Sequence, residues 1–485
     1  MLSVLALSAC AVGPDFQRPA PPALAGYAMV GDDPPASTRV ALGAEVAQSW
    51  WNAFHSPSLD GLMRQALADN PTLQSTDAAL QQARQDLAIA HGQQLPQADA
   101  QFGLQEQRLN FATLGLNSST FPGVNNNPVI DLYSVGATVS YALDVFGEQR
   151  RNAESAKARV EAQSHRLDAA YLTLTGQIAS QAAIIAAVHA EIATVDGMLA
   201  ADRHDIALVR SAQAVGGVAE EARVNADAQS ALDAALLPPL QQQLAQARHA
   251  LAMMEGQPPA GYTPPDFTLA DLPFPATLPV SVPADLVRQR PDILEAEAQA
   301  HAATAFIGVQ TAKLYPNINL TAALTQSALI PGNFFDYSAT AYTLGAGLTQ
   351  PLFHGGQLKA QREEAVQQAR ARTADYQTVV LRAFGQVADL LSALAHDEGA
   401  LAAQQHSLDS ALATLRLDSA AYRIGGQGLL PVVDAQRQVN AARYRLTQAA
   451  AQRYLDAIQL FVATGRGWTA PSAKVASARP AAPPR

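Results

Sequence analysis

The sequence is poor in cysteine, in charged residues and in aromatic residues. Its 485 residues include one cysteine, which cannot form a disulfide within the chain. Charged residues make up 15% of the chain, against about 25% in an average soluble domain, and aromatic residues make up 6%. Alanine and glutamine fill much of the remainder. This composition suits close packing of helices against each other better than a large aromatic core.

Two kinds of partner and one kind of membrane segment are also disfavoured. The net charge is −10 and no basic cluster is present, which disfavours nucleic acid and polyphosphate ligands. No run reaches the roughly 18 consecutive apolar residues of a membrane-spanning helix. If the chain crosses a bilayer, strands must do it.

Catalytic motifs are missing as well. The sequence contains no H-E-x-x-H, no G-x-S-x-G and no C-x-x-C, and its histidines are scattered. The glycine-rich segment Gly425–Gly428 lacks the Lys-Ser/Thr of a phosphate-binding loop, so a tight turn between helices explains it better. We therefore expect neither an enzyme, such as a wall hydrolase, nor a bound cofactor or metal.

One structural unit occurs twice in the chain. Four glycines recur with a constant shift of 209 residues, and the short sequence segments around them are similar. The glycines are Gly136, Gly147, Gly216 and Gly256, and their counterparts are Gly345, Gly356, Gly425 and Gly465. Upstream, Pro71 pairs with Pro291 at a shift of 220, so an insertion of 11 residues lies in the first copy. A repeat this long is a duplicated domain half rather than a solenoid unit.

Each half predicts the same order of elements: a helix, two strands and a long helical hairpin. Leucines that recur every seven residues indicate a helix, and apolar residues that recur about every second residue indicate a strand. In the first half we expect a helix capped by Ser58, a helix after Pro71, two strands within Gln97–Phe146, a helix over Glu148–Gln213 and a return helix from Val218, interrupted at Pro238-Pro239. In the second we expect helix Pro291–Lys313, strands Asn317–Gln326 and Thr340–Leu352, and helices Gln357–Arg423 and Leu429–Thr464.

The domain organisation follows from these patterns. Leu7-Ser8-Ala9-Cys10 resembles a lipoprotein cleavage site, which makes Cys10 the expected lipid attachment point; the alternative is a buried free thiol. The predicted segments are a signal peptide at 1–9, a lipidated extension at 10–57, the first repeat at 58–256, a connector at 257–283, the second repeat at 284–468 and a disordered tail at 469–485.

Four strands per chain cannot close a barrel, and an open sheet edge is not tolerated in lipid. Two chains would supply about 8 strands, whose interior side chains largely fill. Three chains would supply about 12 strands and leave room for a pore. We therefore predict a mixed α and β fold: a trimeric 12-stranded transmembrane β-barrel continued by a long periplasmic α-helical barrel.

Several segments carry a resemblance to a known family. The sequence resembles the outer membrane factor (TolC-like) family, in particular its NodT/OprM-type lipoprotein branch. The matching segments are C-A-V-G-P-D-F-Q-R-P at Cys10–Pro19, P-A-D-L-V-R-Q-R-P-D-I at Pro283–Ile293, F-I-G-V-Q-T-A-K-L-Y-P-N-I-N-L at Phe306–Leu320, P-L-F-H-G-G-Q-L at Pro351–Leu358 and Y-R-I-G-G-Q-G-L-L-P-V-V-D-A-Q-R at Tyr422–Arg437.

The resemblance implies the outer-membrane channel of a tripartite efflux system. Such a channel is a homotrimer that passively conducts small molecules delivered by a periplasmic adaptor and an inner-membrane pump, commonly of the resistance-nodulation-division type. It is held in outer membrane lipid. The alternatives are a type I secretion duct of the same fold and a structural coiled-coil lipoprotein that tethers envelope layers, although a tether needs no strands.

The resemblance also implies roles for individual residues. The two hairpin tips, Val215-Gly216-Gly217 and Ile424-Gly425-Gly426, are expected to dock the adaptor; the simpler explanation is that glycine supplies the turn. Tyr422 and Asp434 match the family's periplasmic gate, in which three aspartates attract cations, whereas the first copy has Gln213 and Asn225 there. The alternative is that Asp434 is an ordinary solvated helix residue.

Overall fold

The computed structural model describes residues 11–20, 24–29, 39–110 and 127–466. Three predictions lie outside these residues: the signal peptide, Cys10 and the disordered tail. The chain divides into two compact units. The first comprises 1–18, 81–162 and 297–375, and the second comprises 19–80, 163–296 and 376–485.

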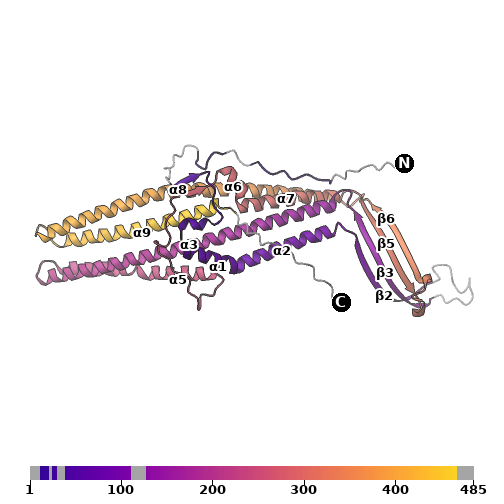
Figure 1. The fold of residues 1–485 in the computed structure, drawn as a ribbon, viewed down its shortest axis with the longest axis horizontal. Helices are drawn as coiled ribbons and strands as arrows, with labels where there is room; N and C mark the ends of the chain where they lie inside the picture. The colour runs from indigo at the N-terminus through magenta and orange to yellow at the C-terminus, as the bar shows by residue number, and fades with distance from the viewer. Residues whose placement is uncertain (1–10, 21–23, 30–38, 111–126, 467–485) are drawn as a thin grey trace, which may run out of the picture. The chain divides into compact units, whose positions relative to one another are not determined.

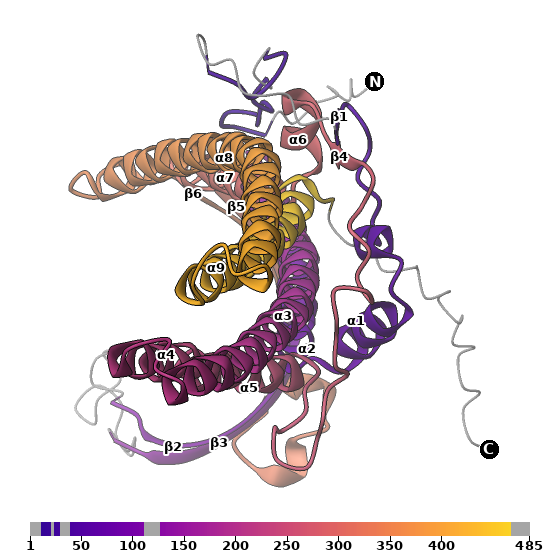
Figure 2. The same ribbon diagram turned by 90° about the vertical axis from the view of Figure 1, so that its left-hand side faces the viewer.

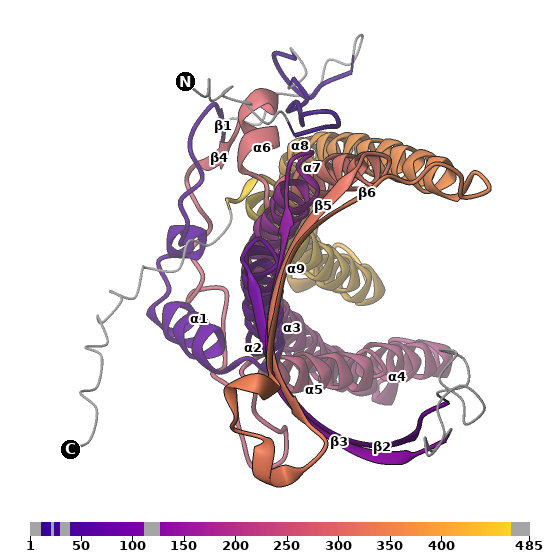
Figure 3. The ribbon, with the colours of Figure 1, turned by 90° about the vertical axis from the view of Figure 1, so that its right-hand side faces the viewer.

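The first unit contains a four-stranded antiparallel sheet with the order β2-β3-β5-β6. The strands are β2 (Gln97–Arg108), β3 (Val129–Leu143), β5 (Asn317–Ala328) and β6 (Thr340–Thr349). They lie side by side in one curved layer (Figure 3). Each half therefore contributes one strand hairpin, as predicted, and the two hairpins join along β3 and β5.

The long helices agree closely with the sequence prediction. α3 (Glu148–Ala214) and α8 (Gln357–Arg423) have 67 residues each, which corresponds to about 100 Å. α4 (Glu220–Ala234) and α5 (Leu237–Met254) return beside α3, and α9 (Leu430–Thr464) returns beside α8 (Figure 2). We call α3, α4 and α5 the first hairpin, and α8 and α9 the second hairpin. The shorter helices α2 (Pro71–Gly92) and α7 (Pro291–Ala312) precede the strand hairpins.

Local chemistry explains these boundaries. Asp144 accepts hydrogen bonds from the backbone N–H groups of Gln149 and Arg150 at 3.1 and 3.0 Å, which satisfies two free donors at the start of α3. The prolines near 238 occupy the first turn of α5, where proline is tolerated, so the return helix of the first hairpin breaks just before them. α9 has no such break, because Thr447-Gln448 stand at the corresponding positions.

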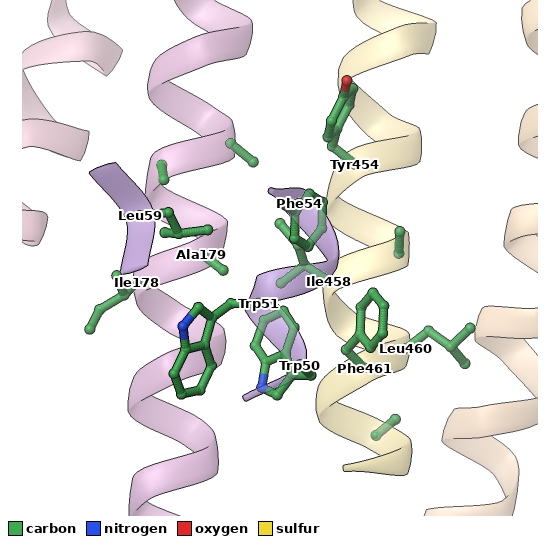
Figure 4. Packing of buried hydrophobic residues seen from close by; sticks show 14 of the residues in the cluster. Trp50, Trp51, Phe54, Leu59, Ile178, Ala179, Tyr454, Ile458, Leu460 and Phe461 are labelled. Atoms are coloured by element: carbon green, nitrogen blue, oxygen red, sulfur yellow. The ribbon is translucent and has the colours of Figure 1, made fainter. Parts of the chain in front are cut away.

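The second unit contains the large hydrophobic core. There η1 (Trp50–Phe54) inserts its aromatic side chains between α3 and α9 (Figure 4). Trp50 stacks on Phe461 with ring centroids 5.3 Å apart, and Ile178 and Ile458 belong to the same cluster of buried side chains. Although aromatic residues are few, Trp50, Trp51, Phe54 and Phe461 contact one another here.

Two local features of the second unit differ from expectation or were not foreseen. The predicted cap Ser58 is wrong: α1 (Pro57–Asp69) is capped by Ser56, whose side chain accepts from the Leu59 backbone N–H at 3.4 Å. Pro57 takes the first helical position, so the residue before it becomes the cap. In addition, β1 (Val40–Leu42) pairs in parallel with β4 (Leu278–Val280), followed by α6 (Pro283–Gln289), which ties the N-terminal extension to the connector.

Two of the described helices, α3 and α8, contain 18-residue windows apolar enough for a membrane span, with mean hydropathies of 1.5 and 1.4. The lack of an unbroken apolar run in the sequence does not exclude this, because such windows tolerate small polar residues. The segment of α3 around Ile178 and Ile185 is buried in the protein core, and a 67-residue helix is about three times longer than a bilayer requires. We interpret both windows as packing surfaces.

Candidate functional site

The sheet of the first unit has one apolar face and one polar face. Alternate side chains of a strand point to opposite faces, and the strand register places the exposed large apolar side chains on a single face. These residues are Phe102, Leu104, Val129, Val135, Val139, Leu320, Leu324, Tyr342, Leu344 and Leu348. The opposite face carries Gln101, Gln105, Ser134, Thr138, Thr321, Thr325 and Thr343. This alternation is typical of a transmembrane barrel with lipid outside and water inside.

The segment that follows Cys10 is bound to the first unit. The Val12 N–H donates to the Phe146 carbonyl at 3.1 Å, at the junction between β3 and α3. Gly13 has a φ of +99°, and a Cβ there would lie 2.5 Å from the Gly308 Cα. Two motifs that carried the family resemblance, C-A-V-G-P and F-I-G-V-Q, thus meet through their glycines.

Arg151 holds this N-terminal segment in place. The side chain is 7% exposed, and its guanidinium contacts the Asp15 carboxylate at 2.7 Å and the Glu154 carboxylate at 2.8 Å. It also donates to the carbonyl of Val12 at 3.3 Å. A buried arginine with both charges and carbonyls as partners is well compensated, so the segment leading back to Cys10 starts from a defined place at the end of β3.

The two hairpin tips have the same turn geometry. At the first tip, the N–H of Gly216 donates to Gln213 and that of Gly217 to Ala212; at the second, Gly425 donates to Tyr422 and Gly426 to Ala421. This is the Schellman pattern, in which the residue after the helix is left-handed. Gly216 and Gly425 have φ values of +75° and +77°.

The second glycine of each tip is not required by a left-handed φ. Gly217 and Gly426 lie outside the positive-φ set, although a Cβ would come within 3.2 Å of a backbone carbonyl at the first and 3.4 Å at the second. The apolar residues before the glycines, Val215 and Ile424, are 84% and 86% exposed. Each tip thus presents an exposed apolar side chain on a flat, glycine-lined turn.

The two expected gate residues lie near the second tip, but the structure does not bring their side chains together through a hydrogen bond. Asp434 on α9 is exposed and contacts Arg437 at 3.3 Å and Gln438 at 3.3 Å. Tyr422 is 38% exposed and ends α8. Asp434 also lines a cavity together with residues of the first hairpin, including the predicted counterpart Asn225.

Sequence reasoning missed three buried carboxyl groups beside that cavity: Asp202, Asp205 and Asp233. The spacing of Asp202 and Asp205, three residues apart on one helix face, was the available signal. In an alanine-rich helix this spacing does not by itself indicate burial. Within the described residues, no group of three or more histidine, cysteine or acidic side chains is arranged to hold a metal ion.

Comparison with known proteins identifies the family. The model for "Outer membrane efflux protein" matches residues 62–257 and 282–466, well over half of the chain. The chain belongs to the outer membrane efflux protein family. This efflux protein is 28% identical over 424 residues to the pyoverdine export outer membrane protein OpmQ of Pseudomonas aeruginosa, covering 87% of this chain and 88% of OpmQ.

Two further comparisons extend over nearly the whole efflux protein. It is 28% identical over 469 residues to nodulation protein T of Rhizobium leguminosarum bv. trifolii, covering 96% of each chain. Its fold matches the outer-membrane channel OprN with a TM-score of 0.84 and 26% identity, covering 95% of this chain and 100% of that chain.

The family assignment confirms the main functional prediction from the sequence. The efflux protein is an outer-membrane channel with a periplasmic domain, and its partners are the adaptor and the inner-membrane pump of a tripartite efflux system. The family is one of transport channels, and transport through a passive channel needs no catalytic residue.

Proposed function

We propose that three copies of the efflux protein close one 12-stranded barrel in the outer membrane and one helical tube in the periplasm, through which small molecules leave the cell passively. The observation that carries this proposal is the four-stranded sheet with an apolar face and a polar face. Each outer strand, β2 or β6, is paired along one edge only, and its other edge has no strand partner among the described residues. Lipid does not tolerate open edges, so neighbouring chains must cover them.

Cysteine cross-linking across the edges tests the closure. Gln101 on β2 is changed to cysteine and combined in turn with cysteines at Thr343, Gly345 and Gly347 on β6, all on the polar face. Oxidation is expected to give a ladder ending at a trimer. The Gly136–Thr325 pair, which is in register within the chain, is the control and should leave the monomer mass unchanged. Protein that sediments as a monomer while conducting in planar bilayers would refute the trimer.

The cargo is proposed to be small molecules rather than unfolded proteins. This is the kind of cargo named for the relative OpmQ, which exports pyoverdine. Deleting the gene should increase accumulation of a fluorescent efflux dye, and the wild-type gene should reverse this. Unchanged dye accumulation, together with loss of a secreted protein from the medium, would favour the type I secretion duct. Unchanged transport together with a weakened envelope would favour the structural tether.

The hairpin tips are the proposed docking sites of the adaptor. The support is their shape: exposed Val215 and Ile424 are each followed by two glycines, so another hairpin tip can approach the backbone closely. Gly217 and Gly426 matter most to this proposal, because the left-handed turn does not require them.

The periplasmic gate is proposed to involve Tyr422 and Asp434. Two observations support this role: both residues lie on the second hairpin near its tip, and both match the family motif. Three chains would place three Asp434 carboxylates around one axis, where they would attract cations. Only the second hairpin supplies this pair of residues.

The anchor is proposed to be Cys10, carrying acyl chains at the mature N-terminus. Residues 11–18 are bound at the end of β3, so acyl chains on Cys10 would start close to the membrane strands. Mass spectrometry should find a processed, acylated Cys10 in the wild type, and Cys10→Ser should lose acylation while the barrel still retains much of the protein in the membrane. An unmodified Cys10 in an unprocessed chain would contradict this.

A further inference from the structure

A cavity of about 600 Å³ lies between α3, α4 and α9, within the second unit. Four carboxyl groups line it: Asp202 and Asp205 from α3, Glu221 from α4 and Asp434 from α9. Arg437 is the single basic residue in the lining. Apolar side chains such as Val209 and Val433 form part of the wall.

Two of these carboxyl groups are buried and form no ion pair with a described residue. Asp202 is 5% exposed and Asp205 is 7% exposed. One Asp202 oxygen, Oδ2, has no hydrogen-bond partner among the residues that the structure describes, while the side chain shares a hydrogen bond with Asp233 on α4. The Asp205 side chain forms neither a hydrogen bond nor an ion pair with any described residue. A buried charge without an ion-pair partner is unfavourable, so both groups require an explanation.

The charges around the cavity do not balance. Arg437 contacts Asp434 at 3.3 Å, so this guanidinium is already engaged by an exposed carboxylate. Its charge still acts on Asp202 and Asp205, but one positive charge faces four acidic groups in the lining. The His204 side chain on α3 also lowers the pKa of Asp205, as Arg437 does.

The fold itself does not need these carboxyl groups. With the shift of 209 residues, the counterparts of Asp202, Asp205 and Asp233 in the second hairpin are Ala411, Thr414 and Ala442. Ala411 and Ala442 are buried in an apolar cluster between α8 and α9. The equivalent helix pair of the second hairpin therefore packs with small side chains at these positions. The first hairpin instead buries acids, which lowers its stability.

We propose that this cavity binds an organic cation, for which Asp202 and Asp205 are the counter-ions. Its volume falls in the range of small-molecule sites, roughly 300–1,000 Å³, and such sites combine apolar walls with a few polar groups. A bare metal ion fits less well, because the described residues include no group of acids arranged to hold one. The proposal concerns the isolated protein, so its failure would leave the duct function standing.

The charge states of the lining determine how binding depends on pH. Burial is the largest cause that raises the pKa of both Asp202 and Asp205 to about 6, and the Asp233 carboxyl adds to the effect on Asp202. Because the pKa of each group is raised, the two carboxyl groups carry more negative charge at pH 7.5 than at pH 5. A cation should therefore bind more tightly at the higher pH.

The test uses tetraphenylphosphonium as the probe and tetraphenylborate, of matching shape and opposite charge, as its control. Equilibrium dialysis against the purified full-length protein in detergent, at equal micelle concentrations for all variants, measures specific binding at pH 7.5 and 5. We expect the cation to bind better at pH 7.5, and the anion to show no specific binding. Equal binding of the two ions, or cation binding that does not change with pH, would overturn the proposal.

Three variants locate the site. Asp205→Asn and Asp202→Asn should each weaken cation binding by about tenfold or more, as expected for loss of a buried charged partner. Asp196→Asn, an exposed acid on the same helix, should bind like the wild type. Arg437→Gln should bind the cation more tightly, a gain that misfolding cannot produce. Unchanged affinity in Asp205→Asn and Arg437→Gln would place the cation elsewhere and refute the site.

Discussion

The two helical hairpins share a backbone but differ in their chemistry. Their ascending helices α3 and α8 are both 67 residues long, and both tips close with the same left-handed glycine turn. The first hairpin returns in two pieces, α4 and α5, and buries acids, whereas the second returns in one helix with an apolar seam. The duplication thus preserved the geometry that glycine imposes, while the side chains between the turns became specialised.

The largest expected effect comes from the feature that the hairpins share. Gly217→Trp and Gly426→Trp should abolish dye efflux, because a bulky side chain would prevent close approach of the adaptor's tip. Trimers should remain intact in native electrophoresis, since neither tip lies in the sheet. The alanine variants at the same positions are the matched controls and should retain most efflux. If the tryptophan variants transport normally, the tips serve only as turns.

The next prediction concerns the helix break that only the first hairpin has. Thr447→Pro introduces into α9 the residue that its counterpart Pro238 supplies in α5. In α9 it falls in the helix interior, so we expect destabilisation of about 3 kcal/mol or more, seen as a lower thermal midpoint. Pro238→Ala should change stability by much less, because it lies in the first turn of α5. Equal effects of both changes would show that α9 already tolerates a break there.

The gate prediction depends on a pair that only the second hairpin contains. Tyr422→Phe combined with Asp434→Ala should raise single-channel conductance in planar bilayers and reduce block by trivalent cations. The matched control is Gln213→Ala with Asn225→Ala, at the corresponding positions of the first hairpin, which should leave cation block unchanged. If the double variant of the second hairpin conducts like the wild type, the gate lies elsewhere.

The smallest expected effect concerns the acids that only the first hairpin contains. The folded-state pKa of Asp205 is raised to about 6 from 3.8, chiefly by burial. The folded state therefore holds its proton more tightly than the unfolded state, and stability is lost as pH rises from about 4 through 6. Asp205→Asn should raise the thermal midpoint by a few degrees at pH 7.5 and by much less at pH 4.

A second-hairpin control completes this test. Thr414→Asp places an acid at the counterpart of Asp205, in a part of α8 that is exposed, so its effect on the thermal midpoint should be small and should not follow the same pH range. If Asp205→Asn raised the thermal midpoint equally at both pH values, the destabilisation would not come from the buried charge of Asp205.

Sequence alone determined the elements whose ends depend on proline, glycine and periodicity. Pro71, Pro291, Gly216 and Gly425 mark helix ends that do not depend on distant contacts, because the constraint acts on the local backbone. Alternation of apolar and polar residues likewise identified the strands. The Ser58 error has a similar local origin, since the cap depended on which residue preceded Pro57.

Only the tertiary structure decided which residues from distant parts of the chain meet. Gly13 touches Gly308, β1 pairs with β4, and Trp50 stacks on Phe461 because the chain folds back over hundreds of residues. The same holds for the cavity, where Asp205 and Arg437 come from different hairpins. Helical periodicity can place an acid on a face of a helix, but burial and charge balance depend on what packs against that face, and no local pattern contains that information.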